Sequence, residues 1–472
     1  MLFSSVTFLY CFLPVVLTVY FLTPMPEGSA KFRNITLLLF SVVFYAFGEP
    51  VYVFLMLLQS LAACLFGALI EKYRGGPASS AALAASVIAG IGGLAIFKYS
   101  DFFINNINAL FHTSATPLGL SLPIGISFYT FQILSYTIDL YRGKIGVQRN
   151  PLTFSVYVAL FPQLIAGPIV RYADVSDALE RREHSLARFA AGARRFVIGL
   201  AKKVLIANTL GELAVICASG DERSALFAWM YAVAYTLHIY FDFSGYSDMA
   251  IGLGHVFGFN FPENFNYPYI SRSVTEFWRR WHMSLSAWFR DYVYIPLGGN
   301  RVPAGRHILN ILFVWLLTGF WHGAGWNFIL WGLYFGLLLL FEKYALSGFL
   351  KRMPAFAAHV WLLLCVIVGW VLFDAPDAAS AAHMLSAMFG GGASGLAGSD
   401  ALYYLRGYAL PLFIAAVGAS PLPARSVRRL SLSATGARFL LILEPLFILL
   451  LMALITAFLV DGSYNPFIYF RF

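Results

Sequence analysis

Hydrophobic residues fill most of the chain in long runs that short basic or glycine-rich loops separate. Runs long enough, or nearly so, to cross about 30 Å of hydrocarbon predict about eleven to thirteen transmembrane or re-entrant helices. The sixth run contains Phe161-Pro162 and Gly167-Pro168, so we expect it to be re-entrant. The runs are residues 6–22, 35–48, 51–70, 82–97, 119–140, 152–170, 196–218, 225–257, 307–320, 324–345, 357–373, 403–420 and 439–460.

The composition supports this pattern and excludes a soluble enzyme. Of the 472 residues, 60% are hydrophobic and only 12% are charged, and the mean hydropathy is +0.73. These values are typical of polytopic membrane proteins. We therefore predict an all-α polytopic membrane protein that forms one membrane domain over residues 1–472, with a core at about 119–345 and a C-terminal aromatic tail at 461–472.

The excess of 32 Lys and Arg over 23 Asp and Glu gives a net charge of +9. Nothing resembles a nucleic-acid module, and the basic residues lie mainly between apolar runs, where they set membrane orientation. Placing the loops around Arg33, Arg142 and Arg428 in the cytoplasm predicts that both termini are extracytoplasmic. The region 258–306 is basic and aromatic, so we expect short amphipathic or re-entrant helices there, lining a pocket on the cytoplasmic side.

The first candidate for chemistry is His282 in the motif Glu276-Phe-Trp-Arg-Arg-Trp-His282. The motif has helical spacing, and Glu276 is expected to pair with Arg279 or Arg280 one turn on. An ionisable group at membrane depth is a functional candidate by default. The alternative is an interfacial amphipathic helix whose arginines hold lipid phosphates and whose histidine caps or bridges. The face that this helix would present comprises Trp278, Trp281, Leu285 and Trp288.

The second candidate is His322 in the motif Gly319-Phe-Trp-His322-Gly. The apolar run that precedes it from Ile308 has only about fourteen residues, too few to cross the bilayer, so we expect His322 to end a half-crossing helix inside the protein. A neutral imidazole there suits a general base. The alternative is a satisfied core histidine. Asn327, at the end of the same motif, is a supporting candidate.

Two intramembrane carboxylates, Asp242 and Asp248, need partners because a charge at that depth is costly. They are expected either to orient a histidine or, as the favoured reading, to pair with an arginine of 272–306. Arg279, Arg280, Arg290 and Asn300 are candidates for donor binding, Asn300 because it sits in the Gly-rich turn Leu297-Gly-Gly-Asn-Arg301. No dense metal-ligand spacing is present, so we expect no metal site.

The chain ends in Asn465-Pro-Phe467-Ile-Tyr469-Phe-Arg-Phe472. Such an aromatic tail is either an interface anchor or a wedge that presents the Tyr469 hydroxyl to a pocket. The two readings stay open at this point.

Taken together, these motifs resemble the membrane-bound O-acyltransferases. Trp-Arg-Arg-Trp-His282 and Trp-His322-Gly resemble the paired sites of that family. Tyr-Phe-Asp242-Phe-Ser-Gly-Tyr-Ser-Asp248-Met-Ala and Leu-Gly-Gly-Asn-Arg301 resemble its bacterial subgroup that acetylates cell-surface polysaccharides, with alginate O-acetyltransferase-like members the most similar. The resemblance runs nearly end to end and is most specific between about 235 and 332.

The resemblance implies helices around a central tunnel in the bacterial inner (cytoplasmic) membrane, with lipid and an extracytoplasmic SGNH-type or related acetyltransferase as partners. It implies that the acyl donor is a cytoplasmic thioester, acetyl-CoA or an acyl carrier, with no tightly bound cofactor. His322 would be the base, His282 would orient the donor or stabilise the oxyanion, and Tyr469 would be an acyl relay.

Three other functions remain open from the sequence. Acyl transfer for peptidoglycan O-acetylation or teichoic-acid D-alanylation would use the same membrane component. A proton-coupled transporter or flippase would use the carboxylates and histidines as a proton relay, although no inverted repeat with paired broken helices is evident. A scaffold of an export complex would tolerate both histidine substitutions.

Overall fold

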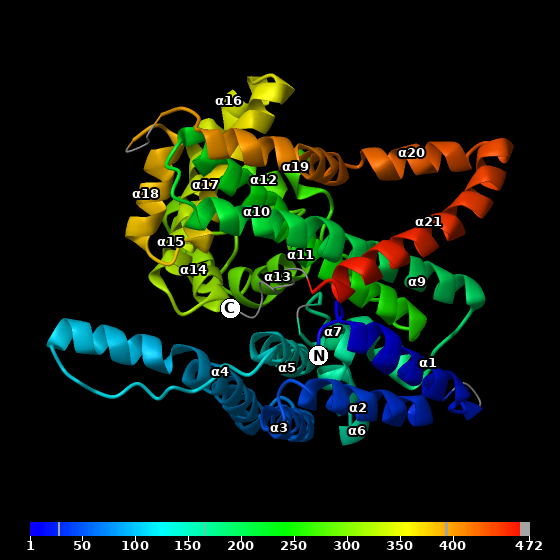
Figure 1. Cartoon of the computed structure of the whole chain (residues 1–472). Coiled ribbons are helices and arrows are strands. Elements are labelled where there is room, and N and C mark those ends of the chain that lie inside the picture. Colours follow the sequence, from blue (N-terminus) through cyan, green and yellow to red (C-terminus); the bar gives the residue numbers. More distant parts are fainter. Residues whose placement is uncertain (27–28, 166, 392–394, 463–472) are drawn as a thin grey trace. The chain divides into compact units, whose positions relative to one another are not determined.

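The computed structural model describes residues 1–26, 29–165, 167–391 and 395–462, and every regular element in them is a helix (Figure 1). Among these residues, six helices are long and apolar enough to cross a membrane. This confirms the prediction of an all-α polytopic membrane protein. The six segments are Tyr52–Lys72, Pro77–Phe111, Trp326–Leu350, Ala355–Asp374, Ser399–Gly418 and Ala434–Val460.

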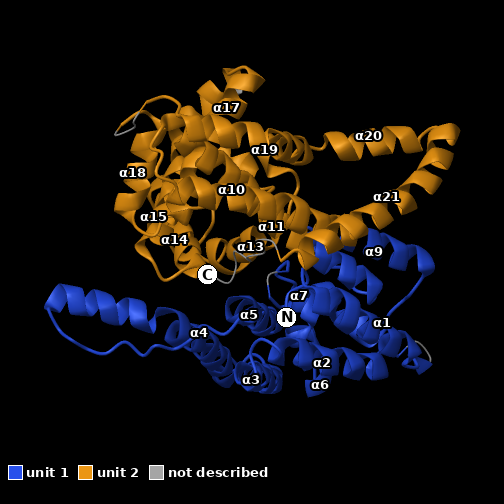
Figure 2. Cartoon of the chain, in the orientation of Figure 1, with its two compact units in different colours: residues 1–196, 247–263 blue, residues 197–246, 264–472 orange. Residues whose placement is uncertain are grey.

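The chain divides into two compact units (Figure 2). Unit 1 comprises residues 1–196 and 247–263, and unit 2 comprises residues 197–246 and 264–472. The helices α9 (Leu186–Ala201) and α11 (Ala225–Val256) contribute residues to both units. The prediction of one membrane domain over 1–472 stays a prediction.

Unit 1 is built from the N-terminal helices and the first part of α9. Its aromatic core includes Phe8, Phe44 and Phe161, with the Phe44 and Phe161 ring centroids 5.5 Å apart. The sixth apolar run is broken as predicted, because a helix ends at Ala159 before a short turn that contains Pro162. The helices are α1 (Leu13–Leu22), α2 (Lys31–Ala46), α3 (Tyr52–Lys72), α4 (Pro77–Phe111), α5 (Ile126–Tyr141), α6 (Pro151–Ala159), α7 (Phe161–Leu164) and α8 (Tyr172–Glu180).

The fifth run is helical only from Ile126, not from residue 119. Gly125 immediately before it has a φ of 77°, and a Cβ at this position would lie 2.6 Å from the carbonyl oxygen of Leu164. The left-handed backbone and this close approach require glycine, so the helix begins after it.

Unit 2 packs around most of α11 and a cluster of buried tryptophans and phenylalanines, among them Phe277, Trp331 and Trp370. Its other helices are α10 (Asn208–Ser219), α12 (Val274–Trp278), α13 (Met283–Phe289), α14 (Ala304–His322), α15 (Trp326–Phe341), α16 (Ser347–Arg352), α17 (Ala355–Asp374), α18 (Ala378–Met388), α19 (Ser399–Gly418), α20 (Leu422–Ser431) and α21 (Ala434–Val460).

Helices α14 and α15 approach each other closely at glycines. A Cβ on Gly319 would lie 2.3 Å from the carbonyl oxygen of Phe328, and a Cβ on Gly332 would lie 2.3 Å from that of Trp315. Any larger residue at either position would push the helices apart. This contact fixes the end of α14, where His322 lies.

Candidate active site

His322 is the last residue of α14, as the sequence predicted. The helix is longer than predicted, however, because it begins at Ala304 and has 19 residues, about 28 Å at 1.5 Å per residue. The polar residues that the sequence placed before this helix lie inside it. His307 is buried and hydrogen-bonds Tyr294 at 2.9 Å and Tyr344 at 2.8 Å, which makes a polar residue tolerable there. The predicted length of about fourteen residues was therefore wrong, although α14 is not among the six described helices that are long and apolar enough to cross a membrane.

Aromatic rings surround His322. The side chain is 7% exposed, and its ring centroid lies 4.9 Å from that of Trp321, 5.0 Å from that of Trp331 and 5.2 Å from that of Phe373. Asn327, in the first turn of α15, donates a hydrogen bond to the carbonyl oxygen of Phe373 at 3.2 Å. Asn327 thus supports a wall of the histidine's surroundings rather than the imidazole itself.

His282 lies at a break between α12 and α13 and not within one continuous amphipathic helix. Its backbone is left-handed, with φ 42° and ψ 55°, which is uncommon for a residue with a side chain. Two backbone hydrogen bonds hold the break against residues 264–266. The amide of Met283 donates to the carbonyl of Asn264, and the amide of Asn266 donates to the carbonyl of Arg280, each at 3.0 Å. The expected single face of three tryptophans and a leucine is therefore divided.

The hydrogen bonds around Asn264 determine the tautomer of His282. The Oδ1 atom of Asn264 accepts from the backbone amide of Ser284 at 3.3 Å and contacts the Nδ1 atom of His282 at 3.0 Å. A backbone amide is always a donor, so the atom of Asn264 that it contacts is the oxygen. His282 Nδ1 must then carry the proton, which leaves a lone pair on Nε2.

The lone pair on Nε2 is buried and has no hydrogen-bond partner in the described part of the chain. The His282 side chain is 2% exposed, and burial lowers its pKa to about 3. Its ring centroid lies 4.7 Å from that of Phe243 and 6.1 Å from that of Trp321. His282 is therefore a neutral hydrogen-bond acceptor in a dry aromatic environment, which favours the donor-orienting role over that of an oxyanion stabiliser.

Trp321 connects the two histidines, because its ring contacts both imidazoles. The structure thus brings the two predicted site residues into one aromatic neighbourhood of unit 2. Glu342 helps to position the break, since its carboxylate accepts from the amides of Val274 and Thr275 at 2.7 and 3.0 Å at the start of α12. Neither Asn264 nor Glu342 was predicted from the sequence. The one available signal was the cluster of turn-forming residues around Asn264.

The intramembrane carboxylates pair with cations upstream of the expected region. Asp242 forms an ion pair with Lys203, and both side chains are almost fully buried. Asp248 accepts from Arg195 at 2.9 Å, and the same guanidinium binds Glu263. The predicted structural role as ion-pair partners is therefore found, but the cations are Arg195 of α9 and Lys203 immediately after that helix, about two helical turns further on.

The arginines proposed for donor binding lie near the surface of unit 2. Arg280 pairs with Glu276 at 2.9 Å, as predicted for residues one turn apart. Arg290 pairs with Asp291 and its side chain remains 61% exposed, while Arg279 and Asn300 are also exposed. Asn300 follows Gly298 and Gly299, whose φ values of 102° and 56° confirm a glycine-dependent turn. The predicted relay residue Tyr469 lies outside the described residues.

Comparison with known proteins shows to which family a chain with this site belongs. The chain is 43% identical over 396 residues to the probable alginate O-acetylase AlgI of Azotobacter vinelandii, a match that covers 82% of this chain and 78% of that protein. It is 36% identical to the peptidoglycan O-acetyltransferase of Helicobacter pylori, over 83% and 80% of the two chains. Its identity to the teichoic acid D-alanyltransferase of Bacillus subtilis is 29%, over 52% and 65% of the two chains.

The family model of membrane-bound O-acyltransferases matches residues 4–373, a range that contains both histidines, Asn264 and the aromatic residues around them. The chain belongs to the membrane-bound O-acyltransferase family.

Proposed function

We propose that this O-acyltransferase takes an acetyl group from cytoplasmic acetyl-CoA and delivers it across the inner membrane for the O-acetylation of an exopolysaccharide such as alginate. An extracytoplasmic acetyltransferase would complete the transfer to the polymer. The observation that carries the choice of polymer is the 43% identity to probable alginate O-acetylases over most of both chains. The chemistry rests on His322 at the end of α14.

In the proposed reaction, a neutral His322 removes the proton from an acceptor hydroxyl, either Tyr469 or a serine of the partner. The resulting alkoxide attacks the thioester carbonyl, a new ester C–O bond forms, and the C–S bond breaks. The imidazolium of His322 then returns its proton to the departing thiolate, which leaves as coenzyme A. This reaction needs no oxidant or metal, and the same imidazole takes up and returns the single proton.

His282 has a different role in this proposal. Its Nε2 lone pair accepts a hydrogen bond from a group of the incoming donor or acceptor, because the bond from Nδ1 to Asn264 makes Nε2 unable to donate. The exposed Arg279 and Arg290, with Asn300 in the adjacent turn, would attract the phosphates of the donor on the cytoplasmic side.

A second candidate is O-acetylation of peptidoglycan, which the 36% identity to the Helicobacter pylori enzyme favours as the alternative. D-Alanylation of teichoic acid has less support, since that match covers only about half of the chain. Both alternatives keep the same base. Peptidoglycan O-acetylation differs from the proposal in the final acceptor, and D-alanylation differs in both the acyl group and the acceptor.

Ester-bound acetate on isolated polymers tests the proposal. A strain that lacks its own copy of the gene would be complemented with the native chain, with His322→Ala, or with His383→Ala, a matched variant at an exposed histidine of α18. We expect acetate to return to the exopolysaccharide with the native chain and His383→Ala but not with His322→Ala. If acetate returned only to peptidoglycan, peptidoglycan would replace the exopolysaccharide as the proposed acceptor. If His322→Ala restored acetate to the polymer, the assignment of His322 as the base would be refuted.

A further inference from the structure

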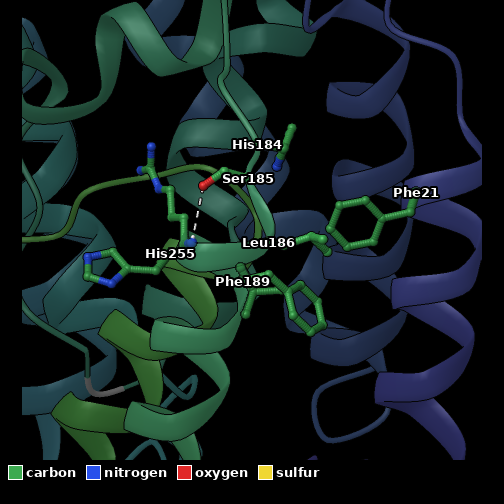
Figure 3. A pocket seen from close by; sticks show the side chains of 8 residues that line it. Phe21, His184, Ser185, Leu186, Phe189 and His255 are labelled. Atoms are coloured by element: carbon green, nitrogen blue, oxygen red, sulfur yellow. Dashed lines mark hydrogen bonds between the residues drawn. The ribbon is translucent and has the colours of Figure 1, made fainter. Parts of the chain in front are cut away.

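A cavity of about 380 Å³ lies in unit 1, far along the sequence from both histidine motifs (Figure 3). The end of α1, the start of α9 and the end of α11 form its walls. Aromatic and aliphatic side chains make up half of the lining, and an arginine, two histidines and a serine make up the rest. The lining residues are Phe21, His184, Ser185, Leu186, Arg188, Phe189, His255 and Val256.

Positive charge gathers around His184, one of the residues that line this cavity. The guanidinium groups of Arg33, Arg182 and Arg188 all act on His184, and burial together with these three charges lowers the pKa of His184 to about 4. The imidazole is therefore neutral and adds no further charge. In the described part of unit 1, no salt bridge to a carboxylate neutralises any of the three arginines.

Arg182 is the most unusual member of this cluster. It is 3% exposed, and its Nη1 donates to the hydroxyl of Tyr20 at 3.1 Å. Among the described residues, its Nε and Nη2 are buried without a hydrogen-bond partner, while its guanidinium stacks on Phe259 at 4.5 Å. A buried charge with free donors is costly unless an anion satisfies it.

Tyr20 connects Arg182 to the wall of the cavity. Its hydroxyl donates to the carbonyl oxygen of Phe257 at 2.9 Å and lies 3.2 Å from His184 Nε2. Since the single hydroxyl proton goes to Phe257, both Arg182 and His184 must donate to the Tyr20 oxygen. This network holds the buried guanidinium beside the His184 side chain that lines the cavity.

Helix α9 begins at the cavity and adds a second feature that favours an anion. Ser185 Oγ accepts from the amide of Arg188 at 3.2 Å, the interaction drawn as a dashed line in Figure 3. The amides of this first turn carry the positive end of the helix dipole. Figure 3 also shows Phe21 and Phe189 beside this turn, and Leu186 next to them is 90% exposed.

We propose that this cavity binds an anionic phospholipid, with the phosphate against Arg188 and the start of α9, beside the His184 side chain behind which Arg182 is buried, and an acyl chain along Phe21 and Phe189. The pairing of uncompensated guanidinium groups with an open apolar wall fits an amphiphile better than a free anion. Anionic lipids of the cytoplasmic leaflet are attracted to basic residues at that interface, where the sequence predicts that the loop around Arg33, a member of this cluster, lies. All of these residues belong to unit 1, so the inference does not depend on acyl transfer.

Native mass spectrometry of the detergent-purified full chain tests this proposal. The probes are phosphatidylglycerol and phosphatidylcholine of equal chain length. We expect one saturable phosphatidylglycerol site, weakened about fivefold when Arg188→Gln removes one cation. Arg33→Gln, which removes a second cation of the cluster, should weaken it similarly. The matched control is Arg149→Gln, an exposed arginine of unit 1 that does not line the cavity, and it should bind as the native chain does.

Three results would overturn the proposal. Equal binding of phosphatidylcholine would show that the headgroup charge does not matter. Equal losses in Arg188→Gln and Arg149→Gln would show nonspecific attraction of lipid to surface charge. Displacement of phosphatidylglycerol by free coenzyme A, or saturation by inorganic phosphate alone, would assign the site to a soluble phosphate.

Discussion

Replacing Asn264 by aspartate changes one atom of the acceptor that fixes His282. The carboxylate still accepts from Ser284 and from His282 Nδ1, at the positions that Asn264 Oδ1 occupies now. The shape of the site is retained, but a negative charge now lies beside a buried imidazole. This variant therefore changes the protonation state of His282 while its side chain keeps the same position.

The expected shift is large. A carboxylate about 4 Å from the imidazolium stabilises it by about 4 kcal/mol at an effective dielectric constant of about 20, which is about three pKa units at about 1.36 kcal/mol each. The pKa of His282, held at about 3 by burial in the native chain, should therefore rise to about 6 in Asn264→Asp.

The direction in which pH changes the rate follows because the neutral form of His282 is the active one. In the native chain, His282 is neutral throughout the range from about pH 5 to 8, so its charge cannot change the rate there. In Asn264→Asp the neutral fraction is lost as the pH falls through about 6, so the rate should fall about tenfold for each further pH unit.

The assay is the pH profile of acetyl release from acetyl-CoA by purified protein in detergent. Ser284→Ala is the matched control, because it removes a hydrogen bond of 2.9 Å to the same Oδ1 without adding charge. It should keep the native profile. A profile of Asn264→Asp that superimposes on the native one would refute the assignment of the tautomer and of the active neutral form.

Three further predictions concern packing, charge and the tail. Gly319→Ala should destabilise the protein by about 1–3 kcal/mol and reduce acetyl release, because its Cβ would lie 2.3 Å from a carbonyl oxygen. Gly305→Ala is the control: residue 305 faces open space, so this variant should change neither thermal unfolding nor activity. Lys203→Met should cost about 3–5 kcal/mol by leaving a buried carboxylate, and adding Asp242→Leu should recover most of it in thermal unfolding. Tyr469→Phe should abolish surface acetylation if the tail relays the acyl group, and unchanged acetylation would make the tail an anchor.

The sequence predicts the helical class and the end of α14 because both depend on local pattern. Long apolar runs have few alternatives in a membrane. Gly323 and Gly325, which follow His322 closely, favour a break in the helix at that point. The break before Pro162 was predictable for the same reason, since proline disrupts the backbone where it stands.

The surroundings of His282 could not be predicted because they depend on distant residues. The motif has helical spacing across Trp278 and Trp281, yet backbone bonds to residues 264–266 override that local preference. The partner of Asp242 was misjudged for a related reason. Lys203 lies within the apolar run 196–218, where no local pattern marks it as the partner of a carboxylate, whereas the structure buries it against Asp242 inside unit 2.

The central claim is that His322 performs acyl transfer, and radiolabelled acetyl-CoA tests it most directly. Purified native protein should cleave the thioester, and His322→Ala should reduce the rate by about 10²–10⁴-fold, the usual contribution of a general base. The variant should still show the native thermal unfolding curve. Full thioester cleavage by a correctly folded His322→Ala would contradict the claim, and failure of the native chain to cleave acetyl-CoA would favour a transporter.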